Sequence, residues 1–96
     1  METFSKILND EMPVLADFHA EWCGCKVMAP ELKKFADSHK QVRVLKVDID
    51  KNRLTAEQFN IQGVPTLILF KKGKVLWRQS GAMNAQQLSS VVKSKL

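Results

Sequence analysis

Two cysteines separated by one glycine are the residues best suited to chemistry in this chain of 96 residues. Cys23 and Cys25 are its only cysteines, and they lie in the segment Trp22-Cys23-Gly24-Cys25-Lys26. Thiols this close can exchange a proton and can form or break a disulfide, but they cannot link distant parts of a fold. In a reducing compartment such a pair is more typical of a reactive or metal-binding site than of a structural disulfide.

The cysteines lie where a strand pattern changes into a helix pattern. Residues 14–20 are mostly apolar, as expected of a strand buried on both faces in a sheet with parallel strands. Residues 25–39 follow with apolar side chains at helical spacing, and Pro30 inside this helix is expected to kink it. In open α/β sheets, reactive groups lie at the carboxyl ends of strands next to helix starts, and Cys23 has this position.

The rest of the chain predicts a mixed sheet covered by helices on both faces. The first half implies a right-handed crossover between parallel strands, and the Lys72-Gly73 turn adds an antiparallel hairpin. The further elements expected are a helix over residues 3–11, strands over 42–48, 66–70 and 75–77, a helix over 53–59, and a last helix capped by Asn84. The buried face of that last helix is expected to carry Leu88, Val91, Val92 and Leu96. We therefore predict a single α/β domain over residues 1–96.

Composition and charge are those of a small soluble domain. Hydrophobic residues make up 45% of the chain and charged residues 26%, so one packed core is expected. The net charge of +5 comes from scattered lysines without interleaved aromatic residues, which argues against a nucleic-acid partner. No apolar run approaches the roughly 20 residues that span a membrane, and the first residues lack the pattern of a secretory signal. The prediction is a cytoplasmic protein without a nucleic-acid or membrane partner.

Short segments spread over nearly the whole chain resemble the thioredoxin family. They are Asp17-Phe18-His19-Ala20-Glu21-Trp22-Cys23-Gly24, Cys25-Lys26, Ala29-Pro30, Lys46-Val47-Asp48, Gly63-Val64-Pro65-Thr66, Lys72-Gly73 and Ser80-Gly81-Ala82. All of them occur in order and at appropriate separations, which makes the resemblance specific. It implies a thioredoxin-like three-layer sandwich and a thiol–disulfide oxidoreductase that acts on disulfide-containing proteins. It also implies a monomer that receives electrons from a thioredoxin reductase.

Three departures from the family pattern matter. The family motif is Trp-Cys-Gly-Pro-Cys-Lys, and here its proline is absent while the spacings to Asp17 and Pro30 are kept. Only a short helix is expected before the first strand, so the amino-terminal edge strand of the family is predicted to be missing or vestigial. His19 stands where many members carry tryptophan. We expect it to be packed or hydrogen-bonded, with tuning of the thiol or metal ligation as alternatives.

The resemblance implies roles for the two cysteines and for one buried acid. Cys23 would attack a substrate disulfide, helped by helix-end N–H groups that lower a thiol pKa, and Cys25 would then release the substrate. Asp17, with Lys46 nearby, would exchange the proton of Cys25 through water and have a raised pKa. The Cys23–Cys25 disulfide would be the redox group, with no other cofactor. The alternatives are two inert core cysteines, and an aspartate at a strand end that faces water.

The resemblance also implies a substrate-binding surface around the cysteines. An X–Pro bond is usually trans, but Pro65 would follow a cis bond and face the thiols, and the Val64 backbone would pair with an extended substrate segment. The residues expected at this surface are Trp22, Gly24, Gly63, Val64, Pro65, Gly81 and Ala82. A tryptophan buried in the core is the alternative for Trp22. His39 is expected to cap a helix, and Trp77 to pack against the sheet.

The single residue between the cysteines sets this pair apart from its relatives. Residues i and i+2 of a helix point about 200° apart, so a Cys-x-Cys disulfide requires the backbone at Cys23-Gly24 to leave the helix. Glycine permits this, but so small a ring meets the preferred disulfide geometry only with strain. Strain in the oxidised form raises the reduction potential. We therefore expect a weaker reductant, and a better oxidant or isomerase, than Cys-x-x-Cys relatives.

Two other classes of function are compatible with these residues. One is a metal or iron–sulfur site shared between two chains, because a single chain has too few soft ligands for a closed tetrahedral site. No metal site is therefore predicted within one chain. The other is a non-catalytic interaction module that uses only the thioredoxin-like surface.

Overall fold

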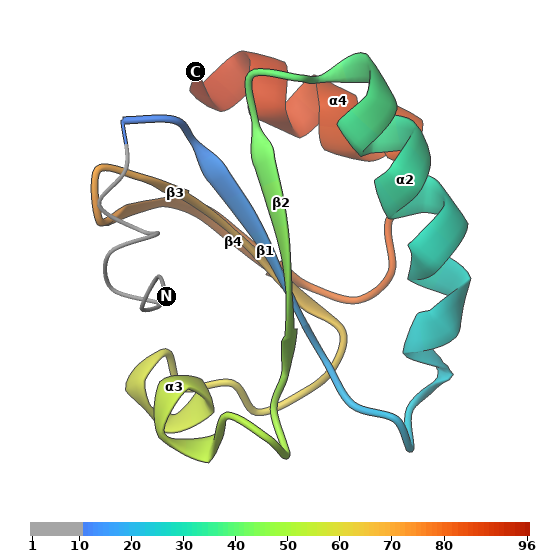
Figure 1. Cartoon of the computed structure of the whole chain (residues 1–96), viewed down its shortest axis with the longest axis vertical. Helices are drawn as coiled ribbons and strands as arrows, with labels where there is room; N and C mark the ends of the chain where they lie inside the picture. Colours follow the sequence, from blue (N-terminus) through green and yellow to red (C-terminus); the bar gives the residue numbers. More distant parts are fainter. Residues whose placement is uncertain (1–10) are drawn as a thin grey trace.

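A mixed sheet of four strands lies at the centre of the computed structural model, which describes residues 11–96 and only the backbone at residues 24 and 25. The strands are β1 (Val14–His19), β2 (Arg43–Asp48), β3 (Thr66–Lys71) and β4 (Lys74–Ser80). Their order in the sheet is β2-β1-β3-β4 (Figure 1). β1 pairs in parallel with β2 and antiparallel with β3, and β3 and β4 form a hairpin. The predicted mixed sheet and hairpin are confirmed.

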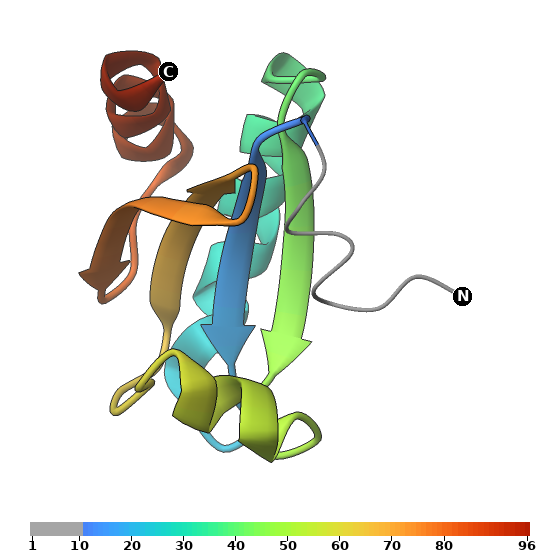
Figure 2. The same ribbon diagram turned by 90° about the vertical axis from the view of Figure 1, so that its left-hand side faces the viewer.

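Helices cover both faces of this sheet (Figure 1 and Figure 2). On one face α2 (Met28–Ser38) and α4 (Ala85–Lys95) lie side by side, and α3 (Arg53–Gln58) lies on the opposite side. A short 3-10 helix, η1 (Gly24–Val27), precedes α2. The three-layer sandwich that the sequence predicts is therefore confirmed.

The alternation of side chains along β1 divides the core into two clusters. The cluster on the side of α2 and α4 includes Leu15, Met28, Leu32, Phe35, Leu67, Leu69, Leu88 and Val92, with Trp77 packed against it. The cluster on the opposite face is formed by Val14, Ala16, Phe18, Val47, Ile68 and Phe70, with Phe59 packed against it. Since odd-numbered residues of β1 face α2, Asp17 and His19 lie on that face. The packing role predicted for Trp77 is confirmed.

The start of α2 differs from the sequence-based expectation. The chain forms a 3-10 turn first, and the α-helix begins only at Met28, so that Pro30 lies in its first turn. The first backbone N–H groups of an α-helix have no partner within the helix. Pro30 therefore lies inside the helix as expected, but at a position where a proline removes no hydrogen bond, so the reason for expecting a kink is absent.

The start of α4 confirms the predicted Asn84 cap. Its side chain accepts the N–H of Gln87 at 2.8 Å, and the Gln87 side chain accepts the N–H of Asn84 at 3.0 Å. Glu31 of α2 accepts the N–H of Ala85 at 3.0 Å, which ties the two helices together. The other end differs, because Leu96 is 47% exposed and not on a buried face.

Two further expectations fall on residues that the structure does not describe. The helix predicted over residues 3–11 lies outside the described range except for its last residue. The missing or vestigial amino-terminal edge strand lies outside that range as well.

Candidate active site

Cys23 lies in the bend between the end of β1 and the 3-10 helix η1. It is half-buried and disulfide-bonded, and its backbone N–H donates to the Ala20 carbonyl at 3.3 Å. Its sulfur lies 3.1 Å from the same carbonyl oxygen, a contact that is a hydrogen bond when the sulfur carries a proton. Cys23 thus lies outside the helical residues.

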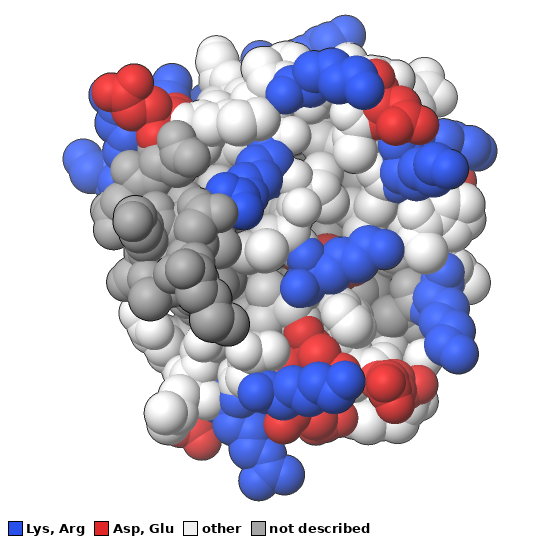
Figure 3. Space-filling view, viewed as in Figure 1, with Lys and Arg blue, Asp and Glu red and all other residues white. Residues whose placement is uncertain are grey.

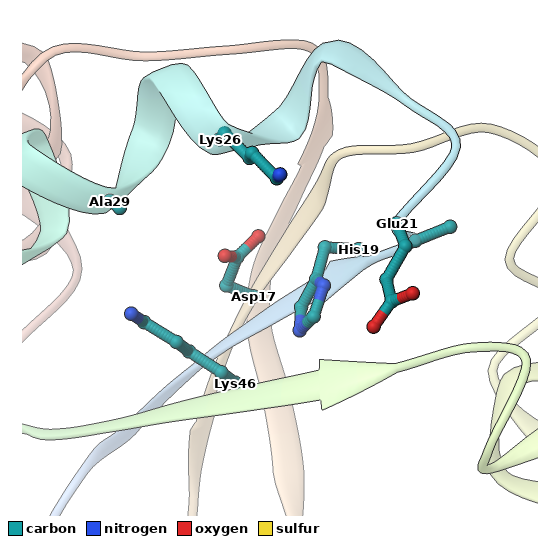
Figure 4. A pocket seen from close by; sticks show the side chains of 7 residues that line it. Asp17, His19, Glu21, Lys26, Ala29 and Lys46 are labelled. Atoms are coloured by element: carbon teal, nitrogen blue, oxygen red, sulfur yellow. The ribbon is translucent and has the colours of Figure 1, made fainter.

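A cavity of about 190 Å³ lies beside this turn, between β1, β2 and the first turn of α2 (Figure 4). Its lining residues are Asp17, His19, Ala20, Glu21, Lys26, Ala29 and Lys46. Ala20, whose carbonyl contacts Cys23, and Lys26, which follows Cys25 directly in the chain, both line the cavity, so it lies next to the Cys-x-Cys segment. The cavity therefore brings Asp17 and Lys46 together with the turn that carries the cysteines.

Asp17 is the buried acid of this cavity. It is only 4% exposed, and its Oδ1 has no hydrogen-bond partner among the described residues. Burial raises the pKa of the Asp17 carboxyl above its usual value, and the positive charges of His19 and Lys46 act in the opposite direction. The carboxyl can therefore hold a proton at a higher pH than a solvated aspartate does. The alternative of an aspartate at a strand end that faces water is therefore wrong.

The loop before β3 contains a cis peptide bond between Val64 and Pro65. The Pro65 carbonyl accepts the N–H of Gly81 at 2.8 Å, and the Thr66 hydroxyl donates to the Gly63 carbonyl at 2.5 Å. Gly81 has a φ of +103°, in the region that favours glycine. Because Phe18 pairs with Thr66, Pro65 lies at the carboxyl end of β1, as the Cys23 bend does.

Trp22 projects from the Cys23 bend toward solvent. It is 70% exposed, and its indole N–H donates to the Asp50 carboxylate at 3.0 Å. Asp50 is itself positioned by the Asp48 side chain, which accepts its backbone N–H at 2.8 Å. The alternative of a tryptophan buried in the core is therefore wrong.

Asp50, which contacts Trp22, and Arg78, which contacts the end of α3, are residues that sequence reasoning missed. The Arg78 guanidinium donates to the carbonyls of Phe59 and Asn60, and thereby ties the end of α3 to β4. No periodicity marks Arg78 as special. The turn-forming residues that follow β2 indicate that Asp50 lies in a turn. They do not reveal that Asp50 contacts Trp22.

The two histidines have different surroundings. His39 is the C-cap of α2, as predicted, and its buried ring stacks on Phe35 with ring centroids 4.3 Å apart. Its Nδ1 lies 3.1 Å from the Phe35 carbonyl oxygen, and its Nε2 lies 3.0 Å from the Ser89 hydroxyl. His19 is half-buried at the end of β1 and lines the cavity.

Charged side chains of both signs are mixed on one face of the described residues (Figure 3). Lysine and arginine side chains are scattered over the face seen in Figure 3, with acidic side chains between them. Among the described side chains, which do not include that of Cys25, no group of three or more His, Cys, Asp or Glu is arranged to hold a metal ion. No helix in this part of the chain is long and apolar enough to cross a membrane.

Comparison with known proteins agrees with this architecture. The family model described as Thioredoxin matches residues 1–94. A thioredoxin of Acidithiobacillus ferridurans is 46% identical over 92 residues, covering 94% of this chain and 85% of the relative. Thioredoxin 1 of Chlorobaculum tepidum is 42% identical over 88 residues, covering 90% and 87%.

Solved structures show the same fold. A mutant thioredoxin from Halobacterium salinarum superposes with a TM-score of 0.87 at 33% identity, covering 95% of this chain and 80% of that one. This chain is therefore an α/β protein of the thioredoxin fold. Its mixed sheet is followed, after the first described strand, by the Cys-x-Cys segment, and a cis-proline lies at the same end of the sheet. The chain belongs to the thioredoxin family, and it is a thiol–disulfide oxidoreductase.

Proposed function

We propose that this chain exchanges disulfides with protein substrates through Cys23 as the attacking and Cys25 as the resolving cysteine. The Cys23 thiolate attacks one sulfur of the substrate disulfide, so that a mixed disulfide forms and one substrate thiolate leaves. The Cys25 thiolate then attacks the Cys23 sulfur, which forms the Cys23–Cys25 disulfide and releases the second substrate thiolate. The substrate gains two electrons and the chain loses them.

The observation that carries this proposal is the position of a disulfide-bonded Cys23 beside the cavity of Asp17. Cys23 is disulfide-bonded, and Cys25 is the only other cysteine of the chain. The residue after Cys25 lines the same cavity as Asp17, whose raised pKa suits a group that takes a proton and returns it. Asp17 would accept the proton of Cys25 when Cys25 attacks, with the Lys46 charge favouring the carboxylate.

The docking surface in this proposal consists of the exposed Trp22 and the loop around the cis bond. Val64 and Pro65 are half-buried, and Gly81 is exposed next to the Pro65 carbonyl. An extended substrate segment would pair with the Val64 backbone, and its apolar side chains would contact Trp22. The partners in this proposal are disulfide-containing proteins, with a thioredoxin reductase as electron donor to a monomer in the cytoplasm.

The direction of exchange follows from the spacing of the cysteines. A disulfide across a single glycine closes a smaller ring than one across two residues, and the strain of that ring favours the dithiol. About 2–3 kcal/mol of strain corresponds to a reduction potential roughly 40–60 mV higher for two electrons. The chain would therefore be more oxidising or isomerase-like than Cys-x-x-Cys thioredoxins.

A matched pair of proteins tests both parts of this proposal. The reduction potential of this chain is measured in glutathione buffers beside that of a variant with proline inserted between Gly24 and Cys25. We expect the insertion to lower the potential by roughly 40–60 mV, to speed insulin reduction and to slow the refolding of scrambled ribonuclease. Equal potentials would refute the oxidising bias.

The cysteine roles are tested separately. Cys25→Ser should form a mixed disulfide with a substrate and fail to release it, whereas Cys23→Ser should form none. If both variants retain the full activity of the parent chain, disulfide exchange at these cysteines is not the function.

A further inference from the structure

The buried Asp17 needs a way to exchange its proton with solvent. It is 4% exposed, so bulk water does not reach it freely. In the resolving step that the proposed function requires, Asp17 can take the proton of Cys25 only as a carboxylate, so a proton that it already holds must first leave to solvent. A side chain that lines the cavity between Asp17 and solvent could carry that proton outward.

His19 has this position. Residues i and i+2 of a strand point to the same face, so His19 lies one step beyond Asp17 on the α2 face of β1, toward the strand end. Both side chains line the cavity, and in Figure 4 the imidazole lies between the Asp17 and Glu21 carboxylates. His19 is half-buried, while Asp17 is buried and Glu21 is exposed. The His19 imidazole thus lies between the buried acid and the exposed edge of the cavity, from which water can take a proton (Figure 4).

The other charged groups around the cavity are less suited to this task. Lys26 of η1 and Lys46 of β2 line it as well, and both are exposed. A protonated lysine has no site for another proton, whereas a neutral imidazole can accept one and return it near neutral pH. Among the described residues that line the cavity, His19 is the one with an imidazole side chain.

We propose that His19 relays the proton of Asp17 to solvent, which makes it a positioning residue for the resolving step. The proton passes from the Cys25 thiol to the Asp17 carboxylate, from the Asp17 carboxylic acid by way of water in the cavity to the neutral imidazole of His19, and from the imidazolium to bulk water. No electrons move in these transfers. In the intermediate state an imidazolium lies near the Asp17 carboxylate, and its positive charge lowers the pKa of Asp17 and so favours release of the proton.

Single-turnover kinetics of His19→Gln test the relay, which rests on the proposed function. Reduced protein is mixed with a peptide disulfide, and the formation and release of the mixed disulfide are followed as separate phases between about pH 5.5 and pH 8. We expect release to slow by roughly tenfold while formation changes by less than about twofold, because only release requires an ionised Asp17, which must first have passed its own proton to solvent. Free imidazole should restore release in proportion to its concentration. An effect on packing alone would not respond to imidazole.

Two controls separate the possible outcomes. Glu21→Gln changes a charge at the same cavity without removing the imidazole, and should leave both phases within about twofold. His19→Trp introduces the residue that many family members carry, so it serves as a second variant if His19→Gln fails to fold, and should show the same dependence on imidazole. Release at the parent rate without imidazole dependence would overturn the relay. Absence of a mixed disulfide in the parent chain would instead refute the proposed function.

Discussion

Asp17 and Lys46 occupy directly paired positions on the parallel strands β1 and β2, yet no ion pair joins them among the described residues. The carboxyl is buried, whereas the lysine side chain is exposed. The ammonium charge therefore lowers the pKa of Asp17 without fully opposing the effect of burial, which raises it. An ion pair at this place would have kept Asp17 ionised and unable to hold a proton.

Replacing Asp17 by asparagine should stabilise the fold at neutral pH. Because the folded-state pKa is raised, stability from this group is fully present below the unfolded pKa and is lost as pH rises through the folded pKa. Asp17→Asn removes a poorly compensated buried charge, so we expect a gain of about 1–3 kcal/mol at neutral pH. Urea unfolding measures this gain, which should vanish near pH 3, where the carboxyl is protonated in both states. A gain of the same size at both pH values would contradict the assignment.

The charge of Lys46 should be visible in the titration of Asp17. In Lys46→Gln the pKa of Asp17 should move further upward, because one of the two positive charges that lower it is gone. Carbon-13 NMR of the carboxyl measures this directly. Lys93→Gln, which removes an exposed charge from α4, is the control and should leave the titration of Asp17 unchanged.

The hydrogen bond between Trp22 and Asp50 should hold the exposed indole in place for substrate. The pair links residues 28 positions apart in the chain, and both are on the surface. Asp50→Ala should lower the unfolding free energy by no more than about 1 kcal/mol, since an exposed contact contributes little. It should raise KM for a protein disulfide severalfold.

A double-mutant cycle with Trp22→Phe tests whether the two residues act together. The effects on KM should be strongly non-additive, because either substitution alone breaks the same contact. Additive effects would show that Asp50 acts on substrate independently of Trp22.

His39 should contribute to stability and not to activity. Its ring stacks on Phe35 and joins α2 to Ser89 of α4, and in the neutral ring Nδ1–H donates to the Phe35 carbonyl while Nε2 accepts the hydroxyl proton. His39→Ala should lower the unfolding free energy by about 2–3 kcal/mol through the lost packing and hydrogen bonds. Ser89→Ala should cost about 1 kcal/mol. Disulfide exchange by the folded variants should match that of the parent chain.

The sequence by itself determined most of the elements and led to the chemistry proposed for the pair Cys23 and Cys25. The apolar run of β1 and the capping box at Asn84 are local, because a few neighbouring residues decide backbone conformation there. Pro30 shows where local reasoning fails. The start of α2 depends on where the 3-10 turn after Cys23 ends, and residue patterns do not reveal that position.

Only the tertiary structure decided which residues meet around the site. Trp22 and Asp50 lie on different loops, and Arg78 reaches the end of α3 from β4. The burial of Asp17, and with it the direction of its pKa shift, depends on β2 and the start of α2 closing around one cavity. Such contacts join residues far apart in the chain, so they depend on strand register and loop paths rather than on the preferences of neighbouring residues.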